Sequence, residues 1–444
     1  MSRESPMHST KNQNRKITPA KSLRGIVILP GDKSISHRAA MLASIAEGTT
    51  RIENYAASAD CSSTLNCVEA LGVQVVRNGS IVTIKGRGKH GLSTPLRDLD
   101  CGNSGTTMRL LSGILAGQPI TTTLIGDESL QKRPMKRIIE PLSLMGANIS
   151  STDGKAPLVV KGRRPLDAIE YQPPVASAQI KSCVLLAGLF GEGVTSVIEP
   201  VPTRDHTEQM LRWFGVDVTT ENGTISLSGD AVLTARDIIV PGDVSAAAFF
   251  AVAAACLDGS TIMMSGVGVN RSRRAILTVL QNLGAKVEVS TISKVCNESV
   301  ADIRVTGGLD QDSHRGTPVI RGETIANLID EIPILAVFGT QLEGGIEIRD
   351  AAELRVKESD RIATVVENLR RMGAEVTEFD DGMRIERSKL HGAVIDSYGD
   401  HRIAMAFAVA GLFAEGETEI IDADCASVSF PGFFEMLEAV TVRV

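Results

Sequence analysis

Residues 241–262 read PGDVSAAAFFAVAAACLDGSTI and contain, in order, the features that decide the fold. The first five residues include Gly, Asp and Ser, which favour the N-cap of a helix. Residues 246–257 are apolar on every face, which predicts a helix that is buried all round. Gly259 is typical of a helix end, and the Ser-Thr-Ile after it favours a strand. The segment therefore predicts one capped, buried helix followed by a strand.

This order of features returns six times, so the sequence predicts a repeat. The polar cap clusters begin at Gly31, Cys101, Ser177, Gly242, Asp330 and Gly399. The closing glycine phrases begin at Glu47, Gly117, Glu192, Asp258, Glu343 and Glu415. A second phrase, such as Leu283-Gly284-Ala285, follows five of the six units. It predicts an outer amphipathic helix that ends in glycine and leads into a pair of strands.

The tripeptide Pro-Gly-Asp occurs at residues 30–32 and again at 241–243, which predicts two points where the chain crosses between domains. A length of 444 residues also favours two or three domains over one. We expect one domain of residues 31–240, a second of residues 15–30 plus 241–444, and a flexible tail of residues 1–14. Since the sixth unit ends before it can form its strands, the strand-like segment 17–29 is expected to complete it. The expected fold is α/β, with three βαβαββ-type units in each domain and parallel buried helices, an inside-out α/β barrel.

The composition excludes several classes of protein. Hydrophobic residues make up 43% of the chain, which is too many for a disordered protein. The net charge of -7 and an aromatic content of 3% argue against nucleic acid as a partner. Seven cysteines without a C-x-x-C pair, and scattered histidines, predict reduced thiols, a cytoplasmic location and no metal site. The sequence shows no secretory signal and no apolar run of the roughly 18 residues that span a membrane.

The positive charges point to an anionic ligand. Parallel buried helices bring their N-termini to one end, where free N–H groups and the helix dipole attract anions. We therefore expect the caps to line a cleft between the domains. Several caps carry cations within one turn, where the dipole disfavours them, and other basic residues lie near the expected cleft: Lys33, Arg38, Arg109, Arg402, Lys132, Arg133, Arg204, Lys357 and Arg361. This pattern favours a small substrate with several phosphate or carboxylate groups.

The phrase Gly31-Asp32-Lys33-Ser34 is not a phosphate-binding P-loop, because Asp32 stands where that motif needs glycine. Candidate acid-base groups are Asp330, Glu331, Glu358, Asp400 and His401. No spacing rule chooses among them, and each could instead cap a helix or pair with a neighbouring arginine.

Several phrases resemble the 5-enolpyruvylshikimate-3-phosphate synthase family of enolpyruvyl transferases. They lie at residues 29–38, 102–109, 132–135, 354–361 and 399–405. The resemblance extends from Lys16 to Leu437, and the combination is specific although no single phrase is. It implies transfer of the enolpyruvyl group of phosphoenolpyruvate to the 5-hydroxyl of shikimate 3-phosphate, by addition and then loss of phosphate. It implies no metal or cofactor, and we expect a monomer.

The resemblance also implies the residues of the site. Shikimate 3-phosphate would be held by Lys33, Ser34, Arg38, Ser177, Gln179, Arg204, Asp330 and Lys357. Phosphoenolpyruvate would lie against Lys33, Asn103, Gly105, Arg133, Gln179, Arg361 and Arg402, with Thr106 in the same turn as Asn103. Asp330 is expected to act as the base at the hydroxyl, Glu358 as the acid at carbon, and Lys33 to stabilise charge.

Two departures from the family pattern matter. Many members have a lysine shortly before the terminal Phe-Pro, where this chain reads Ser427-Val428-Ser429, and Lys181 is a candidate to supply the missing charge. Residues 177–181 read SAQIK and resemble the second subclass of the family. Gly105, where some tolerant members of that subclass have alanine, predicts sensitivity to glyphosate.

Two alternatives stay open. One is the sister enzyme that transfers enolpyruvyl to UDP-N-acetylglucosamine. It usually carries a reactive loop cysteine and an early Lys-Asn pair, whereas Lys33 here precedes Ser34. The other is a non-catalytic anion-binding scaffold built from the same repeats.

Overall fold

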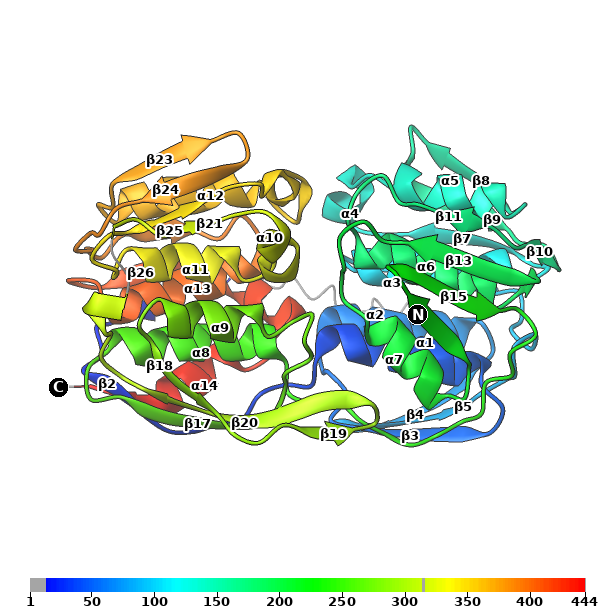
Figure 1. Ribbon diagram of the computed structural model, residues 1–444, viewed down its shortest axis with the longest axis horizontal. Helices are drawn as coiled ribbons and strands as arrows, with labels where there is room; N and C mark the ends of the chain where they lie inside the picture. The colour runs from blue at the N-terminus through cyan, green and yellow to red at the C-terminus, as the bar shows by residue number, and fades with distance from the viewer. Residues whose placement is uncertain (1–12, 314–315, 444) are drawn as a thin grey trace, which may run out of the picture.

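The computed structural model describes residues 13–313 and 316–443. They form a mixed α/β fold with two lobes side by side (Figure 1). One hydrophobic core gathers residues from Ile35 to Val240. A separate core gathers residues of the segment 17–29 with residues from Val244 to Val440. The chain therefore has two domains, and both ends of the described chain contribute to the second. No described helix is long and apolar enough to cross a membrane.

Each unit of the first domain runs strand, buried helix, strand, outer helix and two further strands. The first unit contains α1 (Lys33–Ile45), β3 (Thr49–Glu53), α2 (Ala59–Ala70), β4 (Gln74–Asn78) and β5 (Ile81–Lys85), with β16 (Ile238–Ile239) as its first strand. The second contains β6 (Leu99–Asp100), α3 (Gly105–Ala116), β7 (Thr121–Ile125), the short α4 (Glu128–Lys132), α5 (Lys136–Leu144), β8 (Asn148–Thr152) and β9 (Lys155–Lys161). The third contains β11 (Glu170–Tyr171), α6 (Ala178–Gly188), β13 (Val194–Ile198), α7 (His206–Trp213), β14 (Val218–Glu221) and β15 (Thr224–Ser228). A small extra sheet joins β10 (Leu166–Asp167) to β12 (Gly191–Glu192).

The second domain repeats this order. The fourth unit contains β2 (Ser22–Val27), α8 (Val244–Cys256), β17 (Thr261–Gly268), α9 (Ala275–Asn282), β18 (Lys286–Val289), β19 (Ser293–Val295) and β20 (Glu298–Thr306). The fifth contains β21 (Val319–Ile320), α10 (Glu323–Leu328), α11 (Ile332–Gly339), β22 (Ile346–Ile348), α12 (Arg361–Arg371), β23 (Val376–Phe379) and β24 (Gly382–Ile385). The sixth contains β25 (Val394–Asp396), α13 (His401–Leu412), β26 (Thr418–Ile421), α14 (Phe433–Val440) and β27 (Thr441–Val442). Three short 3₁₀ turns are η1 (Gln311–Ser313), η2 (Ala352–Val356) and η3 (Ala423–Val428).

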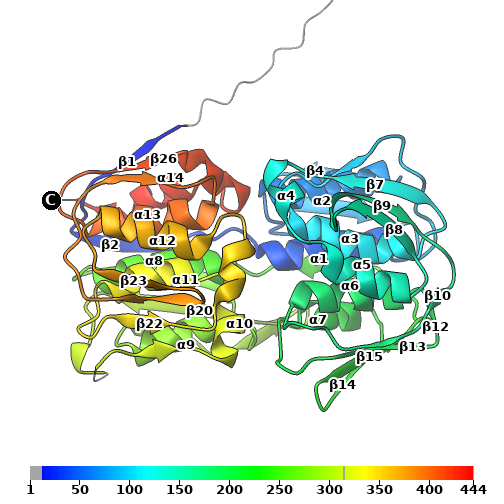
Figure 2. The same cartoon turned by 90° about the horizontal axis from the view of Figure 1, so that it is seen from above.

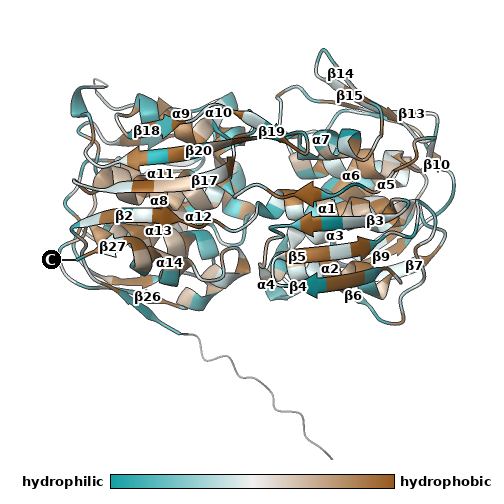
Figure 3. Ribbon diagram, turned by 90° about the horizontal axis from the view of Figure 1, so that it is seen from below, coloured by the Kyte–Doolittle hydropathy of each residue, from teal (hydrophilic) through white to brown (hydrophobic). Residues whose placement is uncertain are grey.

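The four four-stranded sheets of the described chain share one topology. In the second unit the order is β6-β7-β9-β8, with β6 parallel to β7 and the later pairs antiparallel. The outer helices end as the sequence predicts: Gly72, Gly146, Gly215, Gly284 and Gly373 have φ angles between +84° and +91°. Glycine adopts this left-handed conformation without the strain of a side chain. Figure 3 shows hydrophobic and hydrophilic residues alternating along outer strands such as β20, whose hydrophobic face covers the core.

The N-terminal segment serves two units instead of one. β1 (Arg15–Ile17), which shares only Ile17 with the segment expected to do so, pairs with β26 in the sixth unit. β2, however, pairs parallel to β17 in the fourth unit, where it takes the place that β16 takes in the first. On its other side β2 pairs antiparallel with β27 of the sixth unit, so the expectation that residues 17–29 complete the sixth unit alone was wrong. Of the tail expected at residues 1–14, residues 1–12 lie outside the described residues, and Asn14 donates a hydrogen bond to Glu419 (2.8 Å).

The six helices that follow the cap clusters are the interior of the two domains. α8 is buried from Val244 to Ala255, and α13 is buried along its whole length. Because no face of these helices meets water beyond the first turn or so, an apolar sequence with many small residues is what they need. Seen from above, the two lobes lie side by side, and the buried helices of each lobe point one end toward the other lobe (Figure 2).

Candidate active site

A cavity of about 560 Å³ lies between the domains and is lined by the first turns of four buried helices and by residues just before the other two, α8 and α11. The lining residues from these turns are Lys33 and Ser34 of α1, Gly105 and Thr106 of α3, Ala178 and Gln179 of α6, Asp243 before α8, Asp330 before α11, and His401 and Arg402 of α13. The prediction that the helix N-termini frame one cleft between the domains is confirmed.

Four of the six buried helices have a side-chain cap. Asp32, Ser104, Asp243 and Asp400 each accept a hydrogen bond from a backbone N–H of the following turn, at 2.8–3.1 Å. Ser177 before α6 and Glu331 before α11 do not cap with their side chains. Ser177 lines the cavity, so the N-terminus of α6 is open to a ligand there.

Cations outnumber acids on the cavity wall, although the chain as a whole is acidic. The cations are Lys33, Arg109, Arg133, Arg137, Arg204, Arg273, Lys357, Arg361 and Arg402. The acids are Asp60, Asp243, Glu323, Asp330, Asp350, Glu353 and Glu358. Such a wall attracts a small anion by its local field.

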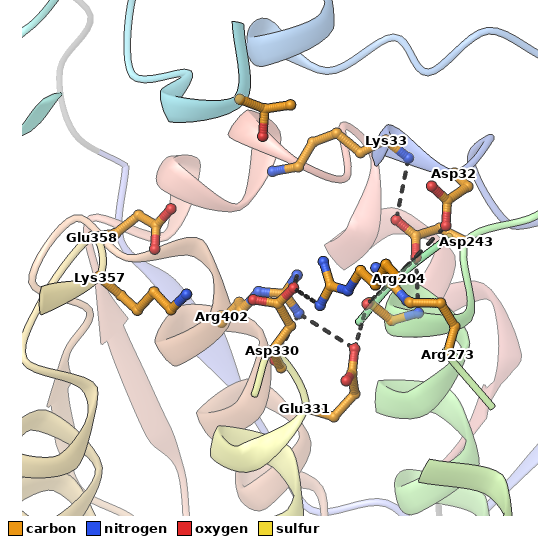
Figure 4. Close-up of polar contacts among 12 residues, drawn as sticks. Asp32, Lys33, Arg204, Asp243, Arg273, Asp330, Glu331, Lys357, Glu358 and Arg402 are labelled. Carbon is orange, nitrogen blue, oxygen red and sulfur yellow. Dashed lines mark hydrogen bonds and ion pairs between the residues drawn. The ribbon is translucent and has the colours of Figure 1, made fainter. Parts of the chain in front are cut away.

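Lys33 reaches the cavity from the first domain. Its ammonium forms a 3.0 Å ion pair with Asp60, from the first turn of α2. Burial would lower the pKa of Lys33, but the Asp60 carboxylate outweighs this and the pKa is raised. Lys33 therefore carries a positive charge at neutral pH, and Figure 4 shows it near Asp32 and Asp243.

Asp330 is surrounded by cations from both domains. Arg204, from the first domain, forms a close ion pair with it, and Arg361 and Arg402 lie 3.6 Å away. Burial would raise the pKa of Asp330, but Arg402 and Arg204 hold it well below its ordinary value. Asp330 is therefore an ionised carboxylate, and Figure 4 shows it beside Arg402.

Glu358 is held by two arginines. One of its oxygens lies 3.3 Å from Arg133 and the other 2.6 Å from Arg361. Arg361 also pairs with Asp400 at 2.8 Å. Burial would raise the pKa of Glu358, but Arg361 and then Arg133 hold it well below its ordinary value. In the described structure the Glu358 carboxylate is thus ionised and paired with two arginines that could otherwise bind an anionic substrate.

Two other candidate acid-base groups differ from these. Burial and then the charge of Lys33 lower the pKa of His401 to about 3, so the imidazole is neutral near pH 7. Burial raises the pKa of Glu331, which is 1% exposed. The neutral imidazole of His401, with its low pKa, is therefore a weak candidate for the base at the hydroxyl.

Of the site residues expected from the sequence, all but Arg38 and Asn103 line the cavity. Arg38 lies behind the wall, where its guanidinium donates to Thr207 (2.7 Å), Ser182 (2.8 Å) and the Ser34 carbonyl (3.0 Å). Asn103 accepts a 2.6 Å hydrogen bond from Arg133. In this structure both act on the cavity through a neighbour.

Lys181 does not supply the missing charge near the terminal Phe-Pro. Its side chain is 1% exposed and forms ion pairs with Glu199 (2.8 Å) and Glu208 (2.7 Å). A buried lysine is stable only with such partners, which draw it away from the cleft. That expectation was wrong, and no described residue after Arg402 lines the cavity.

Several residues of the wall had no assigned role in the sequence. Asp60 resembles any acid in the first turn of a helix. Arg109 was seen as a cation near a cap, and the structure shows it donating to Gln179 (2.6 Å). Arg137 and Arg273 lie in basic stretches that look like ordinary surface. Their spacing contains no signal that separates them from solvent-exposed arginines.

Gly105 leaves room beside two of the arginines. A Cβ atom at this position would lie 2.8 Å from Nη1 of Arg109 and 3.3 Å from Nη1 of Arg133. Contacts this short would force the guanidinium groups to move. The glycine therefore determines how closely a ligand can approach this corner of the cavity.

A two-domain α/β protein with helix N-termini and arginines around one interdomain cleft belongs to the class that binds small, multiply charged anions. Comparison with known proteins makes this specific. Residues 17–437 match the family described as EPSP synthase (3-phosphoshikimate 1-carboxyvinyltransferase). The chain belongs to this family, which confirms the resemblance seen in the sequence.

Relatives cover almost the whole chain. The 3-phosphoshikimate 1-carboxyvinyltransferase of Solibacter usitatus is 52% identical over 96% of this chain and 99% of its own length. The 3-phosphoshikimate 1-carboxyvinyltransferase of Koribacter versatilis is 51% identical over 96% of this chain and 99% of its own length. A solved structure of EPSP synthase from Acinetobacter baumannii aligns with a TM-score of 0.86 at 42% identity, over 97% of this chain and 99% of that one.

Proposed function

We propose that this protein is an enzyme that transfers the enolpyruvyl group of phosphoenolpyruvate to the 5-hydroxyl of shikimate 3-phosphate and releases phosphate. The observation that carries the proposal is the cavity between the domains, where six helix N-termini and many cations meet. Both substrates are multiply anionic, and bringing them together requires surrounding positive charge. At about 4 Å and an effective dielectric constant of about 20, each unit-charge pair contributes about 4 kcal/mol.

The substrates divide the cavity between them. Shikimate 3-phosphate lies against Ser34, Ser177, Gln179, Arg204, Asp330 and Lys357, with Arg38 supporting Ser34 from behind. Phosphoenolpyruvate lies against Gly105, Gln179, Arg133, Arg361 and Arg402, with Asn103 orienting Arg133. Lys33 touches both substrates. The short contacts among these residues support this division, since Arg133 and Arg361 already share one carboxylate.

In the first chemical step Asp330 takes the proton of the 5-hydroxyl, and the oxygen bonds to C2 of phosphoenolpyruvate. The methylene carbon takes a proton from Glu358, which gives a tetrahedral ketal phosphate. In the second step a methyl proton returns to a base, the C2–O bond to phosphate breaks, and the enolpyruvyl ether forms. Lys33 stabilises the charge that moves onto oxygen.

Glu358 must gain a proton before it can act as an acid. In the structure its pKa is low, because Arg361 and Arg133 hold the ionised form. When the anionic groups of phosphoenolpyruvate bind these arginines, Glu358 loses its partners and gains negative neighbours. Both changes raise the pKa of a carboxyl group. Substrate binding thus prepares the acid.

Further parts of the proposal concern the molecule as a whole. We propose that each domain is an inside-out α/β barrel, with boundaries at residues 31–240 and at 15–30 plus 241–444. The two separate hydrophobic cores support these boundaries. A cytoplasmic location fits the seven cysteines, which are all free thiols. A monomeric state remains a prediction.

A phosphate-release assay tests the function. Purified protein with shikimate 3-phosphate and phosphoenolpyruvate should release phosphate, and omission of either substrate should stop the release. Release with UDP-N-acetylglucosamine in place of shikimate 3-phosphate would instead identify the sister enzyme. No release with any acceptor, from protein that still binds shikimate 3-phosphate, would identify an anion-binding scaffold.

A further inference from the structure

Arg273 has no role in the reaction proposed above, yet it is one of the best-buried charges of the cleft. Its side chain is 3% exposed and it lies just before α9, in the second domain. One guanidinium nitrogen, Nη2, lies 2.5 Å from the Ser245 hydroxyl, 3.5 Å from Asp243 and 3.9 Å from Asp32 (Figure 4). The Nε of the same group has no hydrogen-bond partner among the described residues.

The acids around Arg273 stand where the chain crosses between domains. Asp32 caps α1 and Asp243 caps α8, and each follows a glycine of the two Pro-Gly-Asp tripeptides. Gly31 and Gly242 pair directly through their backbones. The two carboxylates are therefore held close together by the fold itself. Burial and then the charge of Asp32 raise the pKa of Asp243, as expected for neighbouring like charges.

Ser245 extends this cluster to a third helix. Its hydroxyl donates a close hydrogen bond to Glu331, at the N-terminus of α11, while it accepts from Arg273. Glu331 is 3.9 Å from Arg402 and directly follows Asp330. Arg273 thus joins the N-termini of α1, α8 and α11. Two of these helix starts carry Lys33 and Asp330 into the cavity.

We infer that Arg273 is a positioning residue: it balances the charges of Asp32, Asp243 and Glu331, so that three helix N-termini can meet and place Lys33 and Asp330. Without Arg273 these two carboxylates would face each other at the crossing, because the other groups that stabilise their charge, His206 and Arg204 at Asp32 and Arg402 at Asp243, each contribute less than Arg273. Removal of one partner from a buried ion cluster is strongly destabilising, because it leaves the other charge uncompensated. The helix starts would then move apart.

A double-mutant cycle tests this inference. Arg273→Met removes the charge and keeps much of the volume, and Asp243→Asn removes one opposing charge but keeps the Oδ1 that caps α8. The four proteins are wild type, each single variant and the double variant. Arg271→Met is the matched control, since Arg271 is exposed and has no hydrogen bond or ion pair among the described residues. Rates of phosphate release give kcat and KM, and urea unfolding gives a second readout that needs no activity.

The expected result is that Arg273→Met lowers kcat more than it raises either KM. The double variant should then have a kcat about tenfold higher than Arg273→Met alone, a coupling of the size found for residues in contact. The same sign of coupling should be seen in urea unfolding. If Arg273→Met does not fold, Arg273→Lys replaces it in the cycle and should keep more activity with Asp243 present than with Asn.

Additive losses in both readouts would overturn the inference, because they would show that Arg273 only fills space. A rise of the KM for one substrate without recovery in the double variant would also overturn it, because Arg273 would then bind that substrate directly. The kinetic readout rests on the proposed function, but the unfolding readout does not. If wild-type protein releases no phosphate but the two substitutions are still coupled in urea unfolding, the proposed function is contradicted and the inference about Arg273 is supported.

Discussion

Arg133 and Glu358 form a 3.3 Å ion pair that joins the first domain to the second across the cleft. Arg133 follows α4, and Glu358 follows η2. Arg361 holds the other oxygen of the same carboxylate at 2.6 Å. In the described structure the Glu358 carboxylate thus occupies cations proposed for phosphoenolpyruvate. Exchange of this anion for the substrate links binding to the proton supply of the reaction.

Glu358→Gln should lower kcat by about 100-fold or more, which is typical for loss of a general acid. The KM for phosphoenolpyruvate should change little or fall, since Arg133 and Arg361 lose an internal competitor. In D₂O with shikimate 3-phosphate present, deuterium should enter the methylene group of phosphoenolpyruvate much more slowly than with wild type. Exchange at the wild-type rate would show that another group protonates the carbon.

Lys33→Ala should lower kcat/KM by about 1000-fold, because the charge that stabilises the transition state is lost. Lys132→Ala is the matched control: Lys132 is an exposed residue of the same domain and does not line the cavity. Its variant should stay within a few-fold of wild type. The opposite ranking in a steady-state assay would contradict the role given to Lys33.

Wild-type enzyme should be inhibited by glyphosate, and Gly105→Ala should reduce that inhibition. The added methyl would lie 2.8 Å from Arg109 and 3.3 Å from Arg133, so both groups would move. The KM for phosphoenolpyruvate should rise by about tenfold, as for a methyl-sized change in a binding pocket. The KM for shikimate 3-phosphate is the internal control and should change little. Wild-type activity that persists at high glyphosate concentration would contradict the prediction.

Protein stability should fall as the pH falls below about 6.5, in part because of His401. Burial and Lys33 depress its folded-state pKa to about 3, so between pH 6.5 and pH 3 the unfolded chain binds a proton that the folded chain does not. This group should cost about 2 kcal/mol of unfolding free energy between pH 6.5 and 4.5. His401→Gln should lose less over this interval in urea titrations. Equal losses in the two proteins would show that His401 is not buried in its neutral form.

The repeat could be predicted from the sequence because helix burial and glycine helix ends leave local signals. Residues such as Gly284 and the stretch 246–257 carry these signals without help from other parts of the chain. The placement of β2 could not be predicted from the sequence, because a strand pattern does not determine which strand it will pair with. The burial of Lys181 also had no local signal, because its partners Glu199 and Glu208 are far along the chain. The same holds for Arg273, whose contacts come from the starts of α1 and α8.

The proposed function requires that one ring of helix N-termini binds both substrates at once. A crystal structure with shikimate 3-phosphate and phosphoenolpyruvate bound tests it most directly. We expect both molecules in the cavity between the domains, with Lys33 in contact with each and Arg133 released from Glu358. Substrates bound elsewhere, or a cavity in which Arg133 still holds Glu358 beside bound phosphoenolpyruvate, would contradict the account.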